Sequence, residues 1–240
     1  MSRRTLLFCA LALVATALFV RLGFWQLQRL HERQARNAIV AQRQHAAPVP
    51  VGALPHDTAS VRYRPTTVTG VYDYGNELVL TSRTHDGAPG VELLTPVRMA
   101  GTDTAVLVDR GWVYAPDGST VDRARWQEGD SAHVGGYVEL YTADGEGAPT
   151  MARDPHVVRR ASRREVAAKL PYPVAPYYVL YTSDTAGAKH PVRREPAALD
   201  EGPHRSYAFQ WFSFALIAIV GAGAVVARER SPRSPGPRAG

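Results

Sequence analysis

Residues 206–227 read SYAFQWFSFALIAIVGAGAVVA, a stretch of 22 residues without a charged side chain. A helix of about 20 apolar residues crosses the hydrocarbon core of a bilayer, so this stretch predicts a transmembrane helix. Tyr207 and Trp211 lie near its start, where aromatic side chains commonly meet the membrane–water interface. The alternative is a buried core helix of a soluble protein, but such helices rarely run for about six turns without a charge.

A second apolar stretch lies near the N-terminus, where residues 6–20 read LLFCALALVATALFV. Arg21 interrupts it, but an arginine can reach the headgroups from a helix end, and the apolar character continues to Trp25. We therefore predict an uncleaved span over residues 6–25. The alternative is a cleaved signal peptide, because residues 2–4 resemble an export signal and residues 15–17 a cleavage site.

The net charge of +6 sits at the two ends of the 240-residue chain. Residues 1–5 carry +2 and residues 228–240 carry +3, which leaves the body between them at +1. Basic ends beside apolar segments predict a cell-membrane protein with two spans, both termini in the cytoplasm and the body outside. Because the body is nearly neutral, we do not expect it to bind nucleic acid. The expected partner of the charged ends and apolar segments is the lipid bilayer. The single cysteine, Cys9, excludes an internal disulfide and a C-x-x-C-H haem attachment.

Between the spans, β-branched and aromatic residues predict an extracytoplasmic α+β domain built mainly on an antiparallel sheet. Residues 26–45 contain no glycine or proline and predict a helical extension of the first span. Within the domain we expect a bulge at Gly70, a bulge or sheet edge at Pro96, and a loop over residues 84–90. Ser162 is a candidate N-cap of the helix that we expect, with Glu165 completing a capping box. The six expected strands and the helix cover residues 61–72, 77–81, 90–99, 104–114, 135–141, 176–181 and 161–170, respectively.

The predicted organisation has five parts. They are a cytoplasmic head over residues 1–5, a first transmembrane helix over 6–25, the extracytoplasmic domain over 26–205, a second transmembrane helix over 206–227, and a disordered basic cytoplasmic tail over 228–240. The tail is short and rich in proline and glycine, which favours disorder.

The sequence offers little support for an enzyme. It contains no nucleotide-binding loop, no G-x-S-x-G and no H-E-x-x-H, and its eight histidines are scattered without metal-ligand spacing. We therefore predict no catalytic residues and no resident metal. A membrane-anchored hydrolase and a ligand-binding or sensor domain remain alternatives, although the 13-residue tail has no room for an output domain.

Two short motifs could carry a function. Arg110, Gly111 and Trp112 follow an apolar run, where they form either a structural corner, with Arg110 paired to Asp109 or a neighbour, or a partner surface. His204 opens the second span, with Tyr207 and Trp211 one and two turns further on. A neutral imidazole at that position either anchors the helix at the interface or binds a haem iron, with the aromatic rings covering the macrocycle.

Four stretches in this order resemble the Surfeit locus protein family of cytochrome c oxidase assembly factors. The first-span motif is LGFWQLQRL, and the second-span motif is HRSYAFQWF. Between them lie an aromatic residue followed by a strand that ends in glycine, and a Gly-x-x-x-x-Thr-Pro strand that leads to VDRGWV. The four stretches cover residues 22–30, 63–70, 90–113 and 204–212.

The resemblance implies a non-enzymatic factor that assists haem a delivery to, or retention in, the catalytic subunit of the terminal oxidase. The implied partners are that subunit and haem a synthase. His204 is the implied haem a ligand, with Tyr207 and Trp211 covering the haem. The sequence departs from the family at His31-Glu32 and at Gly202-Pro203. The remaining motif residues are expected to form a family motif or partner surface: Gly23, Trp25, Gln26, Arg29, Arg110, Gly111 and Trp112.

Overall fold

The computed structural model describes residues 1–143, 154–182, 190–195 and 199–231. The chain forms two compact units. One unit, which we call the helical unit, comprises Met1–Ile39 and Leu199–Gly240; the other, the β domain, comprises Val40–Ala198. Most of the predicted tail, from residue 232 onward, lies outside the described residues.

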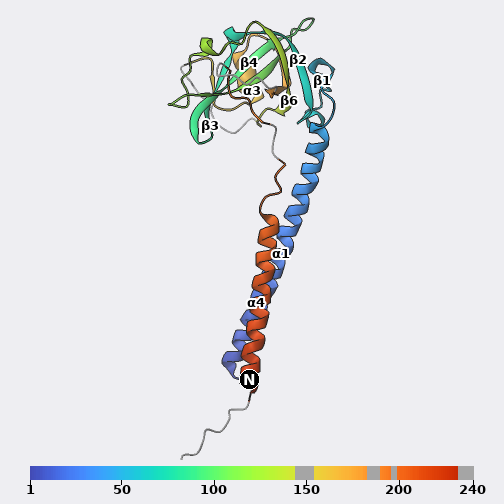
Figure 1. The fold of residues 1–240 in the computed structure, drawn as a ribbon, viewed down its shortest axis with the longest axis vertical. Helices are drawn as coiled ribbons and strands as arrows, with labels where there is room; N and C mark the ends of the chain where they lie inside the picture. Colours follow the sequence, from blue (N-terminus) through green and yellow to red (C-terminus); the bar gives the residue numbers. More distant parts are fainter. Residues whose placement is uncertain (144–153, 183–189, 196–198, 232–240) are drawn as a thin grey trace, which may run out of the picture. The chain divides into compact units, whose positions relative to one another are not determined.

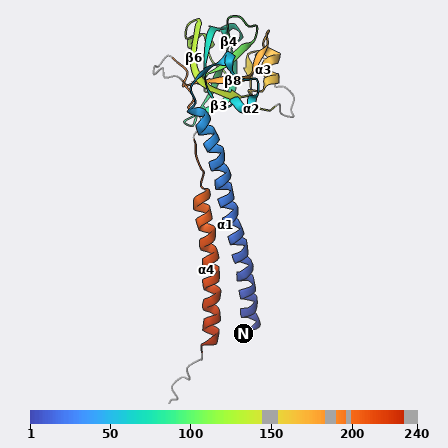
Figure 2. The same cartoon turned by 90° about the vertical axis from the view of Figure 1, so that its right-hand side faces the viewer.

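Two long helices, α1 (Arg3–Gln44) and α4 (His204–Arg230), build the helical unit. They run side by side in both views (Figures 1 and 2). Both are long and apolar enough to cross a membrane, which suggests membrane anchoring. Their apolar side chains are largely exposed, with Leu13 at 67% and Phe209 at 77%. The helix α1 continues without a break to Gln44, over the residues for which the sequence predicts a helical extension.

Close contacts between aromatic rings and a glycine hold α1 and α4 together. A Cβ on Gly23 would lie 2.6 Å from a ring carbon of Phe212, so only glycine allows this approach. The Phe212 ring also meets Phe24 edge-on at 5.4 Å, and Phe19 stacks on Trp211 at 5.8 Å. Gly221, by contrast, has no atom within 4 Å of its Cβ position. The glycine that packs the two helices is therefore Gly23.

The β domain is a mixed sheet that curls into a small barrel (Figures 1 and 2). Its strand order is β1-β2-β6-β8-β5-β4-β3-β7, and a further pairing of β2 with β4 closes a ring of strands. The pairs β1–β2, β3–β7 and β5–β8 are parallel and the others antiparallel, so the predicted, mainly antiparallel sheet is confirmed. The strands are β1 (Val49–Pro50), β2 (Pro65–Tyr72), β3 (Leu78–His85), β4 (Ala88–Arg98), β5 (Ala105–Tyr114), β6 (Ser131–Leu140), β7 (Val157–Val158) and β8 (Val174–Tyr181).

Short helices complete the β domain. The helix α3 (Arg163–Lys169) begins as predicted, because the Ser162 side chain accepts a hydrogen bond from the Glu165 amide at 3.2 Å. Strand β5 is apolar on successive residues because both of its faces are covered: Val106 and Val108 belong to one apolar cluster, and Leu107 belongs to the cluster beneath α3. The other short helices are η1 (Val51–Ala53), α2 (Thr58–Val61), η2 (Tyr74–Asn76) and η3 (Arg123–Trp126).

Two local predictions are wrong. Gly70 forms no bulge: it pairs in register with Ala132, and its missing Cβ would lie 2.4 Å from the Arg98 carbonyl oxygen, where β2 meets β4. The expected loop over residues 84–90 is instead a tight hairpin, in which Asp86 and Gly87 have φ values of 49° and 80°.

Pro96 lies in β4 between two ladders. The pairing of β4 with β3 ends at Leu94, and the pairing of β4 with β2 begins at Val97. The nitrogen of Pro96, which cannot donate, therefore falls in a gap between these two ladders. On its other side Pro96 pairs with Leu107 of β5, so the position is a local gap inside the sheet and not the sheet edge that was expected.

Replacing Gly23 by valine should force α1 and α4 apart, because its side chain would enter the space of the Phe212 ring. In nanodiscs, with Cys9 replaced by serine, spin labels at positions 13 and 216 should report a longer and broader distance distribution. Gly221→Val is the matched control, and it should leave the distribution unchanged because its site is open. An unchanged distribution in Gly23→Val would show that this contact does not set the helix separation.

Candidate functional site

His204, the first residue of α4, is hydrogen-bonded to α1. Its Nδ1 lies 2.8 Å from Oε1 of Gln26, a buried residue with 8% of its surface exposed. An amide oxygen only accepts, so Nδ1 carries the proton and donates it to Gln26. In the neutral imidazole, the other ring nitrogen, Nε2, then holds a lone pair. The predicted site residues Gln26 and His204 thus meet across the pair of helices, although 178 positions separate them in the sequence.

The segment before α4 is tied to α1 by further hydrogen bonds. Arg33 and Asn37 donate to the carbonyl oxygen of Asp200 at 2.9 and 3.1 Å. The Gln34 side chain donates to Glu201 at 2.9 Å. Gly202 has a φ of +72°, a conformation that glycine adopts without strain, and it turns the chain into the helix. These contacts fix where His204 enters the helix.

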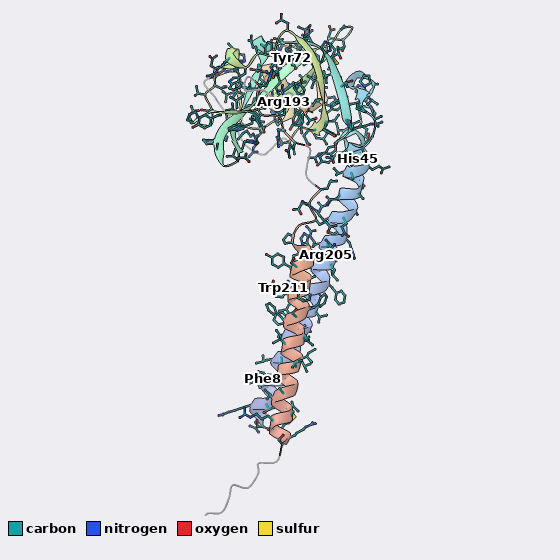
Figure 3. All side chains as sticks on the ribbon, viewed as in Figure 1. Phe8, His45, Tyr72, Arg193, Arg205 and Trp211 are labelled. Atoms are coloured by element: carbon teal, nitrogen blue, oxygen red, sulfur yellow. The ribbon has the colours of Figure 1, made fainter. Side chains whose placement is uncertain are left out.

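The other motif residues of the helical unit have different surroundings. Trp211 stacks on Phe19 and contributes to helix pairing, whereas Tyr207 is 46% exposed. Trp25 is also exposed, and Arg29 pairs with Glu32 at 2.8 Å on the surface of α1. Figure 3 shows Arg205 and Trp211 along α4. Of the predicted haem-covering residues, neither is joined to His204 by a described contact; their role in covering a haem stays a prediction.

In the β domain, Arg110 is the centre of a buried charge network. Its side chain is fully buried and pairs with Glu77 at 2.5 Å and with Glu128 at 3.3 Å. Its Nε donates to Thr95 at 2.7 Å, and Thr95 in turn donates to Glu77 at 2.5 Å. Burial alone would lower the pKa of Arg110, but the charges of Glu77 and Glu128 outweigh burial and raise this pKa. The charged partners of Arg110 are therefore these two glutamates. Arg110 also donates to the Trp126 carbonyl oxygen at 2.5 Å, and its side chain is not exposed.

Gly111 and Trp112 bind a later segment of the chain, residues 190–194. The backbone of Trp112 exchanges two hydrogen bonds with Val192, at 2.8 and 2.7 Å. Gly111 has a φ of +119°, and a Cβ there would lie 2.2 Å from the Val192 carbonyl oxygen, so the position requires glycine. Two residues of β5, Arg110 and Gly111, stand between the pairs Glu92↔Trp112 and Leu94↔Asp109, opposite the single residue Leu93 of β4. This is a β-bulge, which agrees with the interpretation of the motif as a structural corner.

Ion pairs attach the same segment to the barrel. Arg193 bonds Glu128 at 2.6 Å and donates to the Arg110 carbonyl oxygen, while His190 lies 2.6 Å from Glu128. Figure 3 shows Arg193 among the side chains of the β domain. Residues 190–194 are thus held through the Asp-Arg-Gly-Trp motif and its acidic partners. This arrangement supports the interpretation of the motif as a structural corner. Trp112 is partly exposed, and its role in a partner surface stays a prediction.

A second pair of acids lies beside the first network. Glu92 and Asp109 are buried, and Arg194 reaches both, at 3.1 and 3.9 Å. Arg83 approaches Glu92 at 3.5 Å. Burial and then the charge of Glu92 raise the pKa of Asp109 from 3.8 to about 7, against the opposing effect of Arg194. Within the described residues, no three His, Cys, Asp or Glu side chains are grouped to hold a metal ion.

Sequence reasoning missed the acidic partners of Arg110 and the basic residues of the 190–194 segment. Two residues of these buried networks did have a local signal in the sequence. Thr95 lies in the Gly-x-x-x-x-Thr-Pro motif, and Asp109 is a charged residue within an apolar strand. No local signal linked His190 or Arg193 to Glu128, because their contacts span more than 60 residues.

Comparison with known proteins supplies the family. The model of the SURF1 family matches residues 13–216, most of the 240-residue chain. The chain belongs to the SURF1 family. This family is known for cytochrome oxidase assembly factors, generally not for enzymes. The resemblance seen in the sequence is thus confirmed.

Relatives from bacteria to animals share this similarity. An uncharacterised SURF1-like protein of Mycobacterium tuberculosis (strain ATCC 25618 / H37Rv) is 30% identical over 229 residues, covering 89% of this chain and 81% of the relative. A SURF1-like protein of Monosiga brevicollis is 25% identical over 219 residues, covering 82% and 79%. Surfeit locus protein 1 of Homo sapiens is 31% identical over 107 residues, covering 38% of this chain and 36% of the human protein.

Replacing Arg110 by alanine should destabilise the β domain strongly, because Glu77 and Thr95 would lose their buried partner. Breaking a buried ion pair on one side typically costs about 3–5 kcal/mol in the free energy of unfolding. Chemical denaturation of the full-length protein in detergent, followed by near-UV circular dichroism, measures this loss. Arg160→Ala, at an exposed arginine, is the control and should change it by less than about 0.5 kcal/mol. An equal effect of the two variants would contradict the network's role.

The raised pKa of Asp109 predicts a pH dependence of stability. The folded protein keeps a proton on Asp109 that the unfolded chain releases above about pH 4. Protonation of Asp109 therefore contributes fully to the stability of the folded state below about pH 4, and this contribution is lost as pH rises to about 7. The melting temperature of the wild type should therefore fall relative to that of Asp109→Asn across this range. A difference that stays constant with pH would contradict the prediction.

Proposed function

We propose that this SURF1 family protein assists the assembly of a haem–copper terminal oxidase by holding haem a at His204 before the haem enters the catalytic subunit. Haem a is cargo in this proposal: His204 would coordinate its iron and release it again, and no bond of the macrocycle would be made or broken. Family membership supports the assembly role. The hydrogen bond from His204 Nδ1 to Gln26 is the single observation that carries the haem-binding part.

The chemistry of the donor fits a haem iron. Histidines that ligate metals usually donate a hydrogen bond from one ring nitrogen and bind the metal with the other. His204 has this arrangement when its imidazole is neutral, since Nδ1 is engaged with Gln26 and the lone pair is then on Nε2. His204 also opens an apolar helix, with Tyr207 exposed one turn further on. Exposed apolar and aromatic side chains beside the ligand suit the apolar macrocycle, and Tyr207 and Trp211 are our proposed covering residues.

We place the protein in the cell membrane with both termini in the cytoplasm and the β domain outside. The support is the charge of +2 and +3 at the two ends of the sequence, next to the two apolar helices. In this orientation His204 lies at the outer interface. We propose the oxidase catalytic subunit and haem a synthase as partners, because the cargo must come from one membrane protein and pass to another.

Deletion of the gene should lower haem a and oxidase activity in membranes while leaving succinate dehydrogenase activity intact. Complementation with the wild type should restore both quantities, and complementation with His204→Ala should not. The matched control is His31→Ala, which changes an exposed histidine on α1. Full restoration by His204→Ala would exclude the haem-holding role, and normal oxidase in the deletion strain would exclude the assembly role.

A further inference from the structure

Gln26 lies in the buried seam of α1. The buried residues of α1 are Gly23, Gln26 and Leu30, which recur at the spacing of one helix face. Gly23, one turn before Gln26, meets the Phe212 ring, and Leu30, one turn after it, is 5% exposed. The Gln26 side chain therefore emerges from a tightly packed part of the helix, facing α4, and has little freedom to turn away from His204.

The partner of Gln26 is also fixed in place. Asp200, four residues before His204, is held by Arg33 and Asn37 on α1. The chain then turns at Gly202, whose Cβ position lies 3.4–3.5 Å from the far edge of the imidazole, at Cδ2 and Nε2. The imidazole thus has its Nδ1 side against Gln26 and its Nε2 side next to a residue without a side chain.

The hydrogen bond selects one form of the neutral imidazole. The Gln26 amide is oriented with Oε1 toward Nδ1. In this orientation an Nδ1–H tautomer donates to the oxygen, whereas an Nε2–H tautomer would present a lone pair to it and would form a bond only if the amide turned over to donate from its own nitrogen. The contact is partly buried, and on the α1 side Gln26 is only 8% exposed, which limits the water that could replace this bond. Only the Nδ1–H form leaves Nε2 able to bind a metal.

We propose that Gln26 is a positioning residue that fixes the Nδ1–H tautomer of His204 and so presents Nε2 to the haem iron. This inference rests on the proposed haem-holding function for its purpose, but the tautomer itself does not depend on haem. Gln26 acts through His204 and does not touch the cargo.

The first experiment needs no haem. Full-length protein with ¹⁵N-labelled histidine is placed in nanodiscs, and the imidazole ¹⁵N shifts of His204 are assigned by their loss in His204→Ala. The wild type should show a protonated Nδ1 and an unprotonated Nε2. Gln26→Leu should shift the population toward the Nε2–H form, whereas Gln26→Glu, which keeps an acceptor oxygen, should retain the wild-type tautomer.

The second experiment titrates the same four samples, and a Gln28→Leu control, with ferric iron protoporphyrin IX. Gln28 lies on the exposed side of α1 and bonds only Glu32 among the described contacts of its side chain. Loss of a residue that orients a metal ligand typically costs about 10–100-fold in metal affinity, so Gln26→Leu should bind haem that much more weakly. Gln26→Glu should bind at least as tightly as the wild type, and Gln28→Leu should match the wild type.

The outcomes separate the two proposals. An Nε2–H tautomer in the wild type, or equal haem affinity of wild type and Gln26→Leu, would overturn the role of Gln26. If the wild type has the expected tautomer but binds no haem, the haem-holding function fails, and the purpose assigned to Gln26 fails with it. Rescue by Gln26→Glu, with unchanged far-UV circular dichroism in all variants, excludes misfolding as the cause of a loss.

Discussion

The close approach of α1 and α4 at Gly23 is the constraint on which the candidate site depends. A glycine at this position lets the Phe212 ring reach the backbone of α1, and any larger residue would overlap it. One turn further along α1, the same approach brings Gln26 within hydrogen-bond distance of His204. In a bilayer, where apolar surface gains little from helix pairing, such packing and interhelical hydrogen bonds are what hold two helices together. The contact between Gln26 and His204 therefore depends on the same close packing that pairs the two helices.

In the β domain, buried ion pairs hold residues 190–194 against the barrel strands β4 and β5 and against Glu128. Glu128 binds Arg110, His190 and Arg193, while Glu92 and Asp109 bind Arg194. A buried ion pair seldom adds stability over an apolar pair, but removing one partner is costly, because the other charge is then left buried and unpaired. In the sequence, this attached segment leads toward α4, so the network fixes where the chain leaves the barrel.

Much of the fold could be predicted from local patterns. The two long apolar helices, the continuation of α1 to Gln44, the mainly antiparallel sheet and the Ser162 cap all follow from the period and type of neighbouring residues. The closure of the barrel by β2 and β4 could not, because it depends on Gly70 meeting Arg98 across 28 positions of sequence. In the candidate site, the sequence predicted His204 as a ligand and Gln26 only as a motif residue. The contact between them was hidden, because nothing local in the sequence gives the relative register of two helices.

The central claim is that His204 presents Nε2 to a haem iron, and the vibration of that bond tests it most directly. Resonance Raman spectra of reduced, haem-loaded protein should contain an iron–histidine stretching band. The account predicts that this band shifts when histidine is labelled with ¹⁵N and that it is absent from His204→Ala. A haem-loaded wild type whose spectrum is insensitive to the label, or is unchanged in His204→Ala, would contradict it.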